Sequence, residues 1–165
     1  MDKREYTKFD SPIGELHIVS QNEKLVAIYL NEEDFLKKEA TLKGENPQSQ
    51  HPILKRVIQQ LEEYFLGKRL EFDVPIEYDG TDFQMSVWNV LRAIPYGQTR
   101  SYQDVAHSIN NIKAVRAVGL ANKANKLPIV IPCHRVIGKN QSLTGYAGNK
   151  IDIKEKLLEI EGVTL

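Results

Sequence analysis

The residues with the clearest chemical potential form one short run, Pro132-Cys133-His134-Arg135-Val136. Cys133 is the only cysteine in the chain, so it can form neither an internal disulfide nor a cysteine-rich zinc site. Pro132 fixes its own backbone and predicts a rigid turn at the end of a short apolar strand. Two neighbouring cations, His134 and Arg135, would favour the thiolate, which is the nucleophilic form. The run predicts a reactive thiol, although a lone cysteine beside apolar residues is also typical of a buried side chain.

The adjacency of Cys133 and His134 limits how they can work together. Neighbouring side chains point apart in a strand and diverge by about 100° in a helix, so a direct hydrogen bond between them is unfavourable. A bridging water would let His134 act as the base, with a carboxylate from elsewhere orienting its other nitrogen. This arrangement differs from that of thiol proteases, whose Cys and His come from distant segments.

Composition and charge narrow the class of protein. The chain has 165 residues, of which 41% are hydrophobic and 27% charged, and this is typical of a folded domain rather than a disordered one. No apolar run is long enough for a membrane span or a signal peptide, so we expect a cytoplasmic protein. The net charge is zero, but residues 1–80 carry 11 basic and 16 acidic side chains, whereas residues 81–165 carry 11 and 6. The basic half could face a polyanion, although imbalances of this size also arise by chance.

Hydrophobic periodicity predicts a sheet-plus-helix unit in the first half, residues 1–78. Strands are predicted at about 6–9, 15–19 and 25–30, with a hairpin turn at 21–24. Residues 31–50 indicate helix ends and loop, and an apolar stripe predicts a helix from Pro52 to Leu66. Alternation over residues 70–76 predicts a further half-buried strand. No catalytic group is predicted in this half, and His17 is interpreted as a packed or surface histidine.

The second half, residues 79–165, is predicted to be mostly helical. Thr81 with Gln84, and Ser101 with Asp104, have capping-box spacing and predict two helix starts. A third helix is predicted at about 113–122 and a last one at 152–161, with its packed stripe at Ile153, Leu157 and Ile160. The two short helices after Ser101 form a predicted helix-turn-helix. The fold class is therefore α/β, in the broad sense that includes α+β.

The third predicted helix has a basic side and several small side chains. Lys113, Arg116 and Lys123 fall within an arc of about 80°, while Val115 and Val118 are predicted to point toward the core. Small residues would let a large partner approach closely; they are Ala114, Ala117, Gly119 and Ala121. For an isolated helix a solvated basic face is the favoured interpretation, but the preceding helix and the basic half shift the balance toward nucleic acid.

Segment 131–137 (IPCHRVI) resembles the acceptor-cysteine motif of the O6-alkylguanine-DNA alkyltransferases. Six further segments follow in that family's order and approximate spacing: 83–88 (FQMSVW), 94–99 (IPYGQT), 101–102 (SY), 114–119 (AVRAVG), 145–148 (GYAG) and 161–162 (EG). Segment 11–14 resembles the start of the family's N-terminal domain. The resemblance covers essentially the whole chain and is strongest from residue 81 onward.

The resemblance implies both a fold and a reaction. The fold would be a ribonuclease-H-like domain at 1–78, followed by a DNA-binding and alkyl-acceptor domain at 79–165. The partner would be double-stranded DNA that contains O6-alkylguanine, or O4-methylthymine, bound in its minor groove with the damaged base flipped out. The alkyl group would pass irreversibly to the protein's own cysteine, once per molecule and without a cofactor or metal. The resemblance also implies a monomer, with binding along DNA that could be cooperative.

Residue roles follow from the same resemblance. Cys133 would accept the alkyl group, His134 would act as the water-mediated base, and Glu161 would orient it. Asn125 would be the hinge before the acceptor segment. Tyr102 would assist nucleotide rotation and protonate the leaving guanine.

DNA contacts and a base pocket are implied as well. Arg116 would be the finger that fills the vacated space in the stack, because a guanidinium can stack and donate hydrogen bonds at once. The other implied DNA contacts are Tyr102, Lys113, Ala114, Asn122, Lys123 and Arg135. The pocket would be lined by the main chain of Cys133 and Val136, and by Tyr146 and Ala147, the latter where some members carry serine.

Three other functions remain open at this level. A binding-only relative that flags lesions would lack the reactive cysteine, which is present here. A thiol hydrolase or redox protein would act without DNA. A helix-turn-helix regulator with an inert cysteine would bind a specific sequence, whereas a repair protein should bind DNA with salt sensitivity and little sequence preference.

Overall fold

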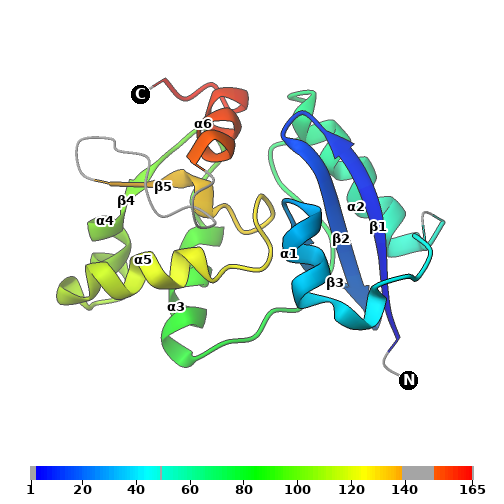
Figure 1. Cartoon of the computed structure of the whole chain (residues 1–165). Coiled ribbons are helices and arrows are strands. Elements are labelled where there is room, and N and C mark those ends of the chain that lie inside the picture. Colours follow the sequence, from blue (N-terminus) through cyan, green and yellow to red (C-terminus); the bar gives the residue numbers. More distant parts are fainter. Residues whose placement is uncertain (1–2, 49, 139–150, 165) are drawn as a thin grey trace. The chain divides into compact units, whose positions relative to one another are not determined.

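The computed structural model describes residues 3–48, 50–138 and 151–164, and the chain divides into two units, Met1–Tyr78 and Asp79–Leu165 (Figure 1). The first unit combines a sheet with helices, and the second is mostly helical, as the sequence predicted. In the part of the chain that the structure describes, no helix has the length and apolar character needed to cross a membrane.

An antiparallel three-stranded sheet forms the centre of the first unit. Its strands, β1 (Arg4–Ser11), β2 (Gly14–Gln21) and β3 (Lys24–Tyr29), follow one another in the order β1-β2-β3. The β2–β3 connection consists of Asn22 and Glu23, which have φ values of 53° and 61°. Positive φ at both central residues is the signature of a type I′ turn, whose twist matches that of a hairpin. The predicted hairpin is therefore confirmed.

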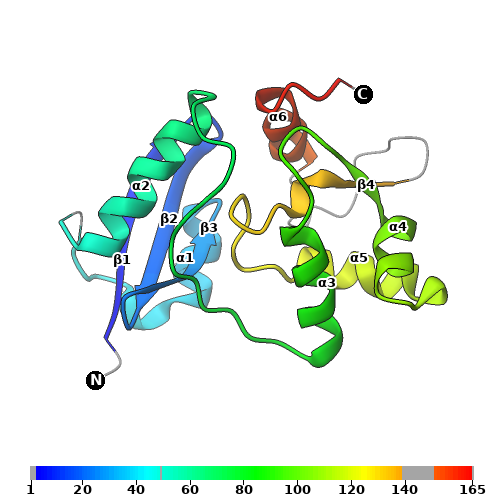
Figure 2. The ribbon, with the colours of Figure 1, turned by 180° about the vertical axis from the view of Figure 1, so that it is seen from behind.

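Helices cover both faces of this sheet. Helix α2 (Pro52–Phe65) lies on one face and the short helix α1 (Glu32–Lys38) on the other, as the two views show (Figures 1 and 2). Strand alternation assigns β2 side chains to these two faces. On the α1 side, a core forms around Phe35; its other buried members are Tyr6, Val19, Ala27 and Leu42. Leu42 belongs to a 3₁₀ turn, η1 (Ala40–Leu42), that follows α1.

The prediction of a strand at residues 70–76 is wrong, although the side chains alternate in exposure from Phe72 to Ile76; Leu70 is exposed. This segment shares only one isolated bridge with the sheet, between Ile76 and Leu25. Pro75 has no N–H to donate to a ladder. Upstream, the backbone of Asp73 is bonded by Gln60 of α2, whose amide donates to the carbonyl at 3.1 Å and accepts from the N–H at 2.8 Å. A helix side chain thus replaces the neighbouring strand as hydrogen-bond partner.

The second unit is built from short helices around a two-stranded parallel pair. Its elements are α3 (Asp82–Arg92), β4 (Arg100–Ser101), α4 (Tyr102–Ser108), η2 (Ile112–Ala114), α5 (Val115–Lys123), η3 (Cys133–Arg135), β5 (Val136–Ile137) and α6 (Ile151–Ile160). Both predicted capping boxes are present, Thr81 with Gln84 on α3 and Ser101 with Asp104 on α4. They fix where α3 and α4 begin, because two backbone N–H groups without helical partners are bonded at each start.

Helices α4 and α5 pack together across a tight turn at Asn110, whose φ of 58° an asparagine tolerates. The predicted third helix begins as the 3₁₀ turn η2 and continues as α5. Val118 is fully buried, but Val115 is 37% exposed, so its predicted inward position is wrong. Trp88 of α3 donates from its indole nitrogen to the Ala121 carbonyl at 2.9 Å, which ties α5 to the unit's core.

Candidate active site

Cys133 begins the 3₁₀ turn η3 and is only 2% exposed. Pro132 before it has φ −79° and ψ 64°, and the Cys133 N–H donates to the Ile131 carbonyl at 2.7 Å. These values describe an inverse γ-turn, in which the central residue reverses the chain within three residues. The rigid turn that Pro132 predicted is therefore present.

The apolar segment before Cys133 is a turn and not the predicted strand. Ile131 donates its N–H to the Leu127 carbonyl at 2.8 Å, which closes a loop too tight for extended backbone. Asn125 bonds both ends of this loop: its amide donates to the Ile131 carbonyl at 2.8 Å, and its oxygen accepts from the Leu127 N–H at 3.0 Å. Ile129 has φ 75°, a rare conformation for a β-branched residue. The strand prediction failed because the backbone groups pair with Asn125 and with each other.

Burial dominates the chemistry of the thiol. It raises the pKa of Cys133 to about 11, against the opposing effects of a hydrogen bond from Asn125 and the charge of Lys154. The prediction that His134 and Arg135 favour the thiolate is wrong. Burial lowers the pKa of His134, and the Arg135 guanidinium is held by another partner. At neutral pH the Cys133 side chain is therefore a thiol and not a thiolate.

His134 and Glu161 form a buried pair, with 2.6 Å between Nε2 and Oε2. Burial alone would raise the pKa of Glu161, but the hydrogen bonds and charges of His134 and Arg135 outweigh it and hold the pKa well below its ordinary value. Burial lowers the pKa of His134 despite the carboxylate. The pair is thus a neutral imidazole that donates to a carboxylate.

This pairing fixes the tautomer of His134. With the proton on Nε2, the lone pair lies on Nδ1, which is buried and has no hydrogen-bond partner among the residues that the structure describes. A neutral imidazole nitrogen in this state can accept a proton, and the carboxylate behind it stabilises the resulting cation. The pairing of His134 with Glu161 that the resemblance implied is therefore present, and their roles as base and orienting carboxylate stay a prediction.

Arg135 completes the same network and is only 6% exposed. Its Nε and one Nη donate to the two oxygens of Glu161 at 2.8 and 3.0 Å, and its other Nη donates to the Ile94 carbonyl at 2.6 Å. The N–H of Gly97, at φ 79°, donates to Glu161 as well at 3.1 Å. The predicted DNA contact by Arg135 is therefore wrong, because its guanidinium is buried and donates its hydrogen bonds to Glu161 and to the Ile94 carbonyl.

Lys154 is the residue at this site that sequence reasoning missed. It lies on α6, is fully buried, and its Nζ is 3.5 Å from the Tyr102 hydroxyl. Burial lowers its pKa to about 8, against an opposing effect of Cys133. The buried residues among the described side chains of α6 are Lys154, Leu157 and Leu158, and Glu161 directly after the helix is buried too. Of the predicted stripe, Leu157 is confirmed, whereas Ile153 and Ile160 are only half-buried. A lysine at helical spacing from two leucines was the available signal.

Tyr102, the first residue of α4, is 9% exposed and lies beside Lys154, whose Nζ is 5.6 Å from the centre of its ring. The structure thus brings Cys133, Lys154 and Tyr102 into one group. Val136 is buried in β5, and its N–H donates to the Cys133 carbonyl. Tyr146 and Ala147 lie outside the described residues.

The basic side of α5 and η2 faces solvent. Lys113, Arg116 and Lys123 are exposed, and Ala114 is half-buried. Asn122, in contrast, is 1% exposed, and its amide donates to the Cys133 carbonyl at 3.4 Å. Its predicted DNA contact is therefore wrong: it links α5 to the acceptor segment instead.

Two family models match the chain, one for each unit. Residues 5–78 match the ribonuclease-like domain of 6-O-methylguanine DNA methyltransferase, and residues 82–163 match its DNA-binding domain. A constitutive methylated-DNA–protein-cysteine methyltransferase of Bacillus subtilis is 47% identical over 159 residues, with 96% of each chain covered. The corresponding protein of Methanosarcina acetivorans is 48% identical over 160 residues, covering 95% of this chain and 97% of its own.

Solved structures agree with these sequence relatives. The O6-methylguanine methyltransferase of Mycobacterium tuberculosis superimposes with a TM-score of 0.86 at 41% identity, covering 96% of this chain and 93% of its own. A structure of the same organism's protein in complex with DNA gives 0.79 at 40% identity, with coverages of 95% and 92%. The chain therefore belongs to the 6-O-methylguanine-DNA methyltransferase family, the methylated-DNA–protein-cysteine methyltransferases.

Proposed function

We propose that this protein repairs double-stranded DNA by transferring the alkyl group of O6-alkylguanine to the sulfur of its own Cys133, once per molecule. The observation that carries the proposal is the buried acceptor turn, where a thiol precedes a neutral histidine held by Glu161 at 2.6 Å. The curated relatives are named for the same transfer to a protein cysteine. The protein would act in the cytoplasm as a monomer, and O4-methylthymine is a second substrate by the same chemistry.

The proposed reaction is a displacement at the alkyl carbon. The sulfur–carbon bond forms as the bond between that carbon and O6 breaks, and guanine leaves with the electron pair. The thiol proton passes through a water molecule to Nδ1 of His134, and Glu161 stabilises the imidazolium. Tyr102 donates a proton to the leaving guanine, which balances the charge.

Lys154 has a place in this scheme because it interacts with both Cys133 and Tyr102. Its ammonium would stabilise negative charge as it develops on sulfur, in a site where little water screens the interaction. With a pKa of about 8, it can also return a proton to Tyr102 near neutral pH. Asn125 supports the same sulfur by its hydrogen bond and holds the acceptor turn in shape.

On the DNA side, we assign the contact to η2 and α5, in the minor groove. Exposed Lys113 and Lys123 suit phosphate contacts, and the small side chain of Ala114 would let the DNA backbone approach the start of the helix closely. A Cβ added at Gly119 would meet no other part of the described structure within 4 Å beyond its chain neighbours and its own helix backbone, which leaves room for a partner at this position. The damaged base would flip out, Arg116 would take its place, and Val136, Tyr146 and Ala147 would line the receiving pocket.

The decisive experiment is an intact mass spectrum after mixing the protein with a duplex that carries one O6-methylguanine. We expect one methyl group in place of a hydrogen, mapped to Cys133, and no gain for Cys133→Ala, which should still bind the duplex. Binding without transfer by the unaltered protein would overturn the proposal in favour of a lesion-flagging role. Transfer that persists in Cys133→Ala would refute the acceptor assignment.

The finger assignment predicts a substrate-dependent defect. Arg116→Ala should slow reaction with duplex O6-methylguanine by roughly tenfold or more, but should barely change reaction with the free base, because only the duplex requires extrusion and stacking. Single-turnover rates on both substrates measure this. Lys126→Ala, which removes an exposed positive charge outside α5, is the matched control. Equal slowing on both substrates would contradict the role of Arg116.

A further inference from the structure

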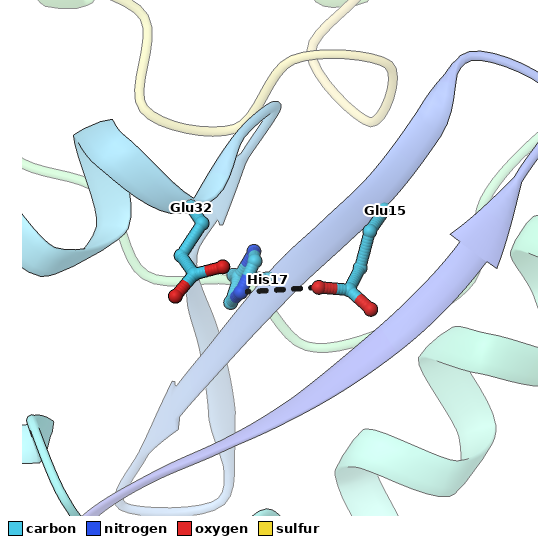
Figure 3. A group of neighbouring side chains, drawn as sticks. All are labelled: Glu15, His17 and Glu32. Carbon is cyan, nitrogen blue, oxygen red and sulfur yellow. Dashed lines mark ion pairs between the residues drawn. The ribbon is translucent and has the colours of Figure 1, made fainter.

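A second group of chemically active side chains lies in the first unit, where sequence reasoning predicted none. Glu15 and His17 belong to β2, and Glu32 is the first residue of α1. Each offers one ligand atom, and the three atoms all lie within 4.8 Å of one another. In Figure 3 the imidazole of His17 lies between the two carboxylates.

The sequence explains why these three side chains meet. Glu15 and His17 are two residues apart in a strand, so both point to the α1 side of the sheet. Asn31 caps α1 by accepting from the Asp34 N–H, and this fixes Glu32 at the helix start. Phe35, one turn later, stacks on the imidazole with 4.6 Å between ring centres. The histidine is therefore fixed, whereas the two glutamates are exposed and can change rotamer.

His17 is buried without a hydrogen bond from its side chain to any residue that the structure describes. It is 1% exposed, its Nδ1 has no partner, and its Nε2 is 3.7 Å from Oε1 of Glu15, beyond hydrogen-bond distance. Burying a polar group without a partner costs about 1–3 kcal/mol, so such groups call for an explanation. A ligand between Nε2 and the two carboxylates would give this nitrogen the close partner that Glu15, at 3.7 Å, does not supply.

Charge around the ring favours the form that binds metals. Burial lowers the pKa of His17, and Lys8, directly across on β1, lowers it as well, against the two glutamates. A neutral imidazole offers a nitrogen lone pair to a metal ion, which is the form that a metal-binding histidine adopts. One imidazole nitrogen with two carboxylates is a donor set suited to Zn²⁺.

We propose that Glu15, His17 and Glu32 bind one Zn²⁺ ion, with water completing the coordination. Because the three atoms lie within 4.8 Å of one another, a central point lies at most about 2.8 Å from each, and Zn²⁺ bonds to nitrogen and oxygen measure about 2.0–2.2 Å. A shift of under about 1 Å per ligand, which rotation of the exposed glutamates can provide, closes the site. The ion would fasten the start of α1 to β2 and stabilise the folded unit by mass action.

The test uses the full chain carrying Cys133→Ser, so that the thiol cannot bind the metal. Calorimetric titration with Zn²⁺ should give one ion per chain, and saturation should raise Tm. Co²⁺ in the same site should show the visible absorption of a four-coordinate complex. Glu32→Gln should weaken binding at least roughly tenfold, because even residues behind the ligands typically contribute that much.

Two further variants show whether Zn²⁺ binding depends on the cluster itself, and neither substitution alters a core residue. Glu33→Gln removes the same charge one residue later, outside the cluster, and should bind Zn²⁺ as the parent does. Lys8→Gln removes the opposing cation and should tighten binding. Absence of stoichiometric binding, or equal affinity in Glu32→Gln and Glu33→Gln, would overturn the proposal.

Discussion

Glu161→Gln is expected to slow alkyl transfer by roughly 10²–10⁴-fold, the usual contribution of a positioned base, while DNA affinity is retained. The carboxylate fixes the proton of His134 on Nε2 and stabilises the imidazolium that forms. An amide can present its NH₂ to that nitrogen and place the imidazole proton on Nδ1, which removes the base. Single-turnover rates on methylated duplex DNA measure the loss.

The same substitution should destabilise the second unit by about 3–5 kcal/mol, because it leaves the buried Arg135 charge without its partner. Rates must therefore be taken well below Tm, with circular dichroism confirming the fold. Glu159→Gln, an exposed change of equal charge on the same helix, is the control and should leave both rate and Tm unchanged.

A pH profile separates a positioning role of Glu161 from a purely structural one. Glu161 raises the pKa of His134, so its removal lowers that pKa further. The histidine must be neutral to act as base, and the acidic limb of the rate profile should therefore move to lower pH in Glu161→Gln. If the rate falls but the acidic limb of the profile does not move, the role of Glu161 is structural only.

Lys154→Met should also reduce transfer, by roughly 10²–10³-fold, because one preorganised charge next to the reacting sulfur is lost. Its effect on stability should be the opposite of that of Glu161→Gln. A fully buried ammonium is replaced by an apolar side chain of similar length, which should stabilise the fold by roughly 2 kcal/mol near neutral pH. An inactive but more stable protein is the expected result.

The sign of the pH dependence follows from the lowered pKa of Lys154. The folded value of about 8 lies below the ordinary 10.5, so the folded state binds this proton less well than the unfolded state. The resulting penalty is absent above pH 10.5, grows as pH falls, and is complete below pH 8. The stability advantage of Lys154→Met should follow the same course in thermal melts.

Lys156→Met is the control for this pair of measurements, since it removes an exposed lysine from the same helix. It should leave both rate and pH dependence close to those of the unaltered protein. Near-normal transfer by Lys154→Met, or a loss of stability at pH 7, would refute the electrostatic role of Lys154.

The acceptor segment was predictable from sequence because its chemistry is contiguous. Cys133 and His134 are neighbours, and Pro132 specifies the turn that carries them. Helix starts were equally predictable, since Thr81 and Ser101 act on donors three residues away. These features depend on local geometry, which a short stretch of sequence contains in full.

Charged residues that face inward were not predictable from an apolar stripe. On α6 the pattern favoured Ile153 and Ile160, whereas Lys154 on the helix and Glu161 directly after it are buried. Arg135 was likewise predicted to contact DNA, yet its guanidinium donates to Glu161 and to the Ile94 carbonyl. Such side chains are buried because distant segments satisfy them, and no local periodicity records those segments.

The strand predicted at 70–76 failed for a related reason. Its side chains alternate correctly, but Pro75 cannot donate and Gln60 of α2 takes the backbone bonds of Asp73. Side-chain alternation reports which faces are buried, and it does not report where the backbone hydrogen bonds go.

The convergence of donors on Glu161 constrains how this family can drift in sequence. Three residues, His134, Arg135 and Gly97, donate to one carboxylate, so changing any one member alters the value of the others. Substitution of Arg135 alone would remove hydrogen-bond donors from the buried Glu161 carboxylate, and substitution of Glu161 alone would leave the buried Arg135 charge without its partner. We therefore expect substitutions at these positions to be strongly epistatic, so that a single change is tolerated less well than a matched set of changes.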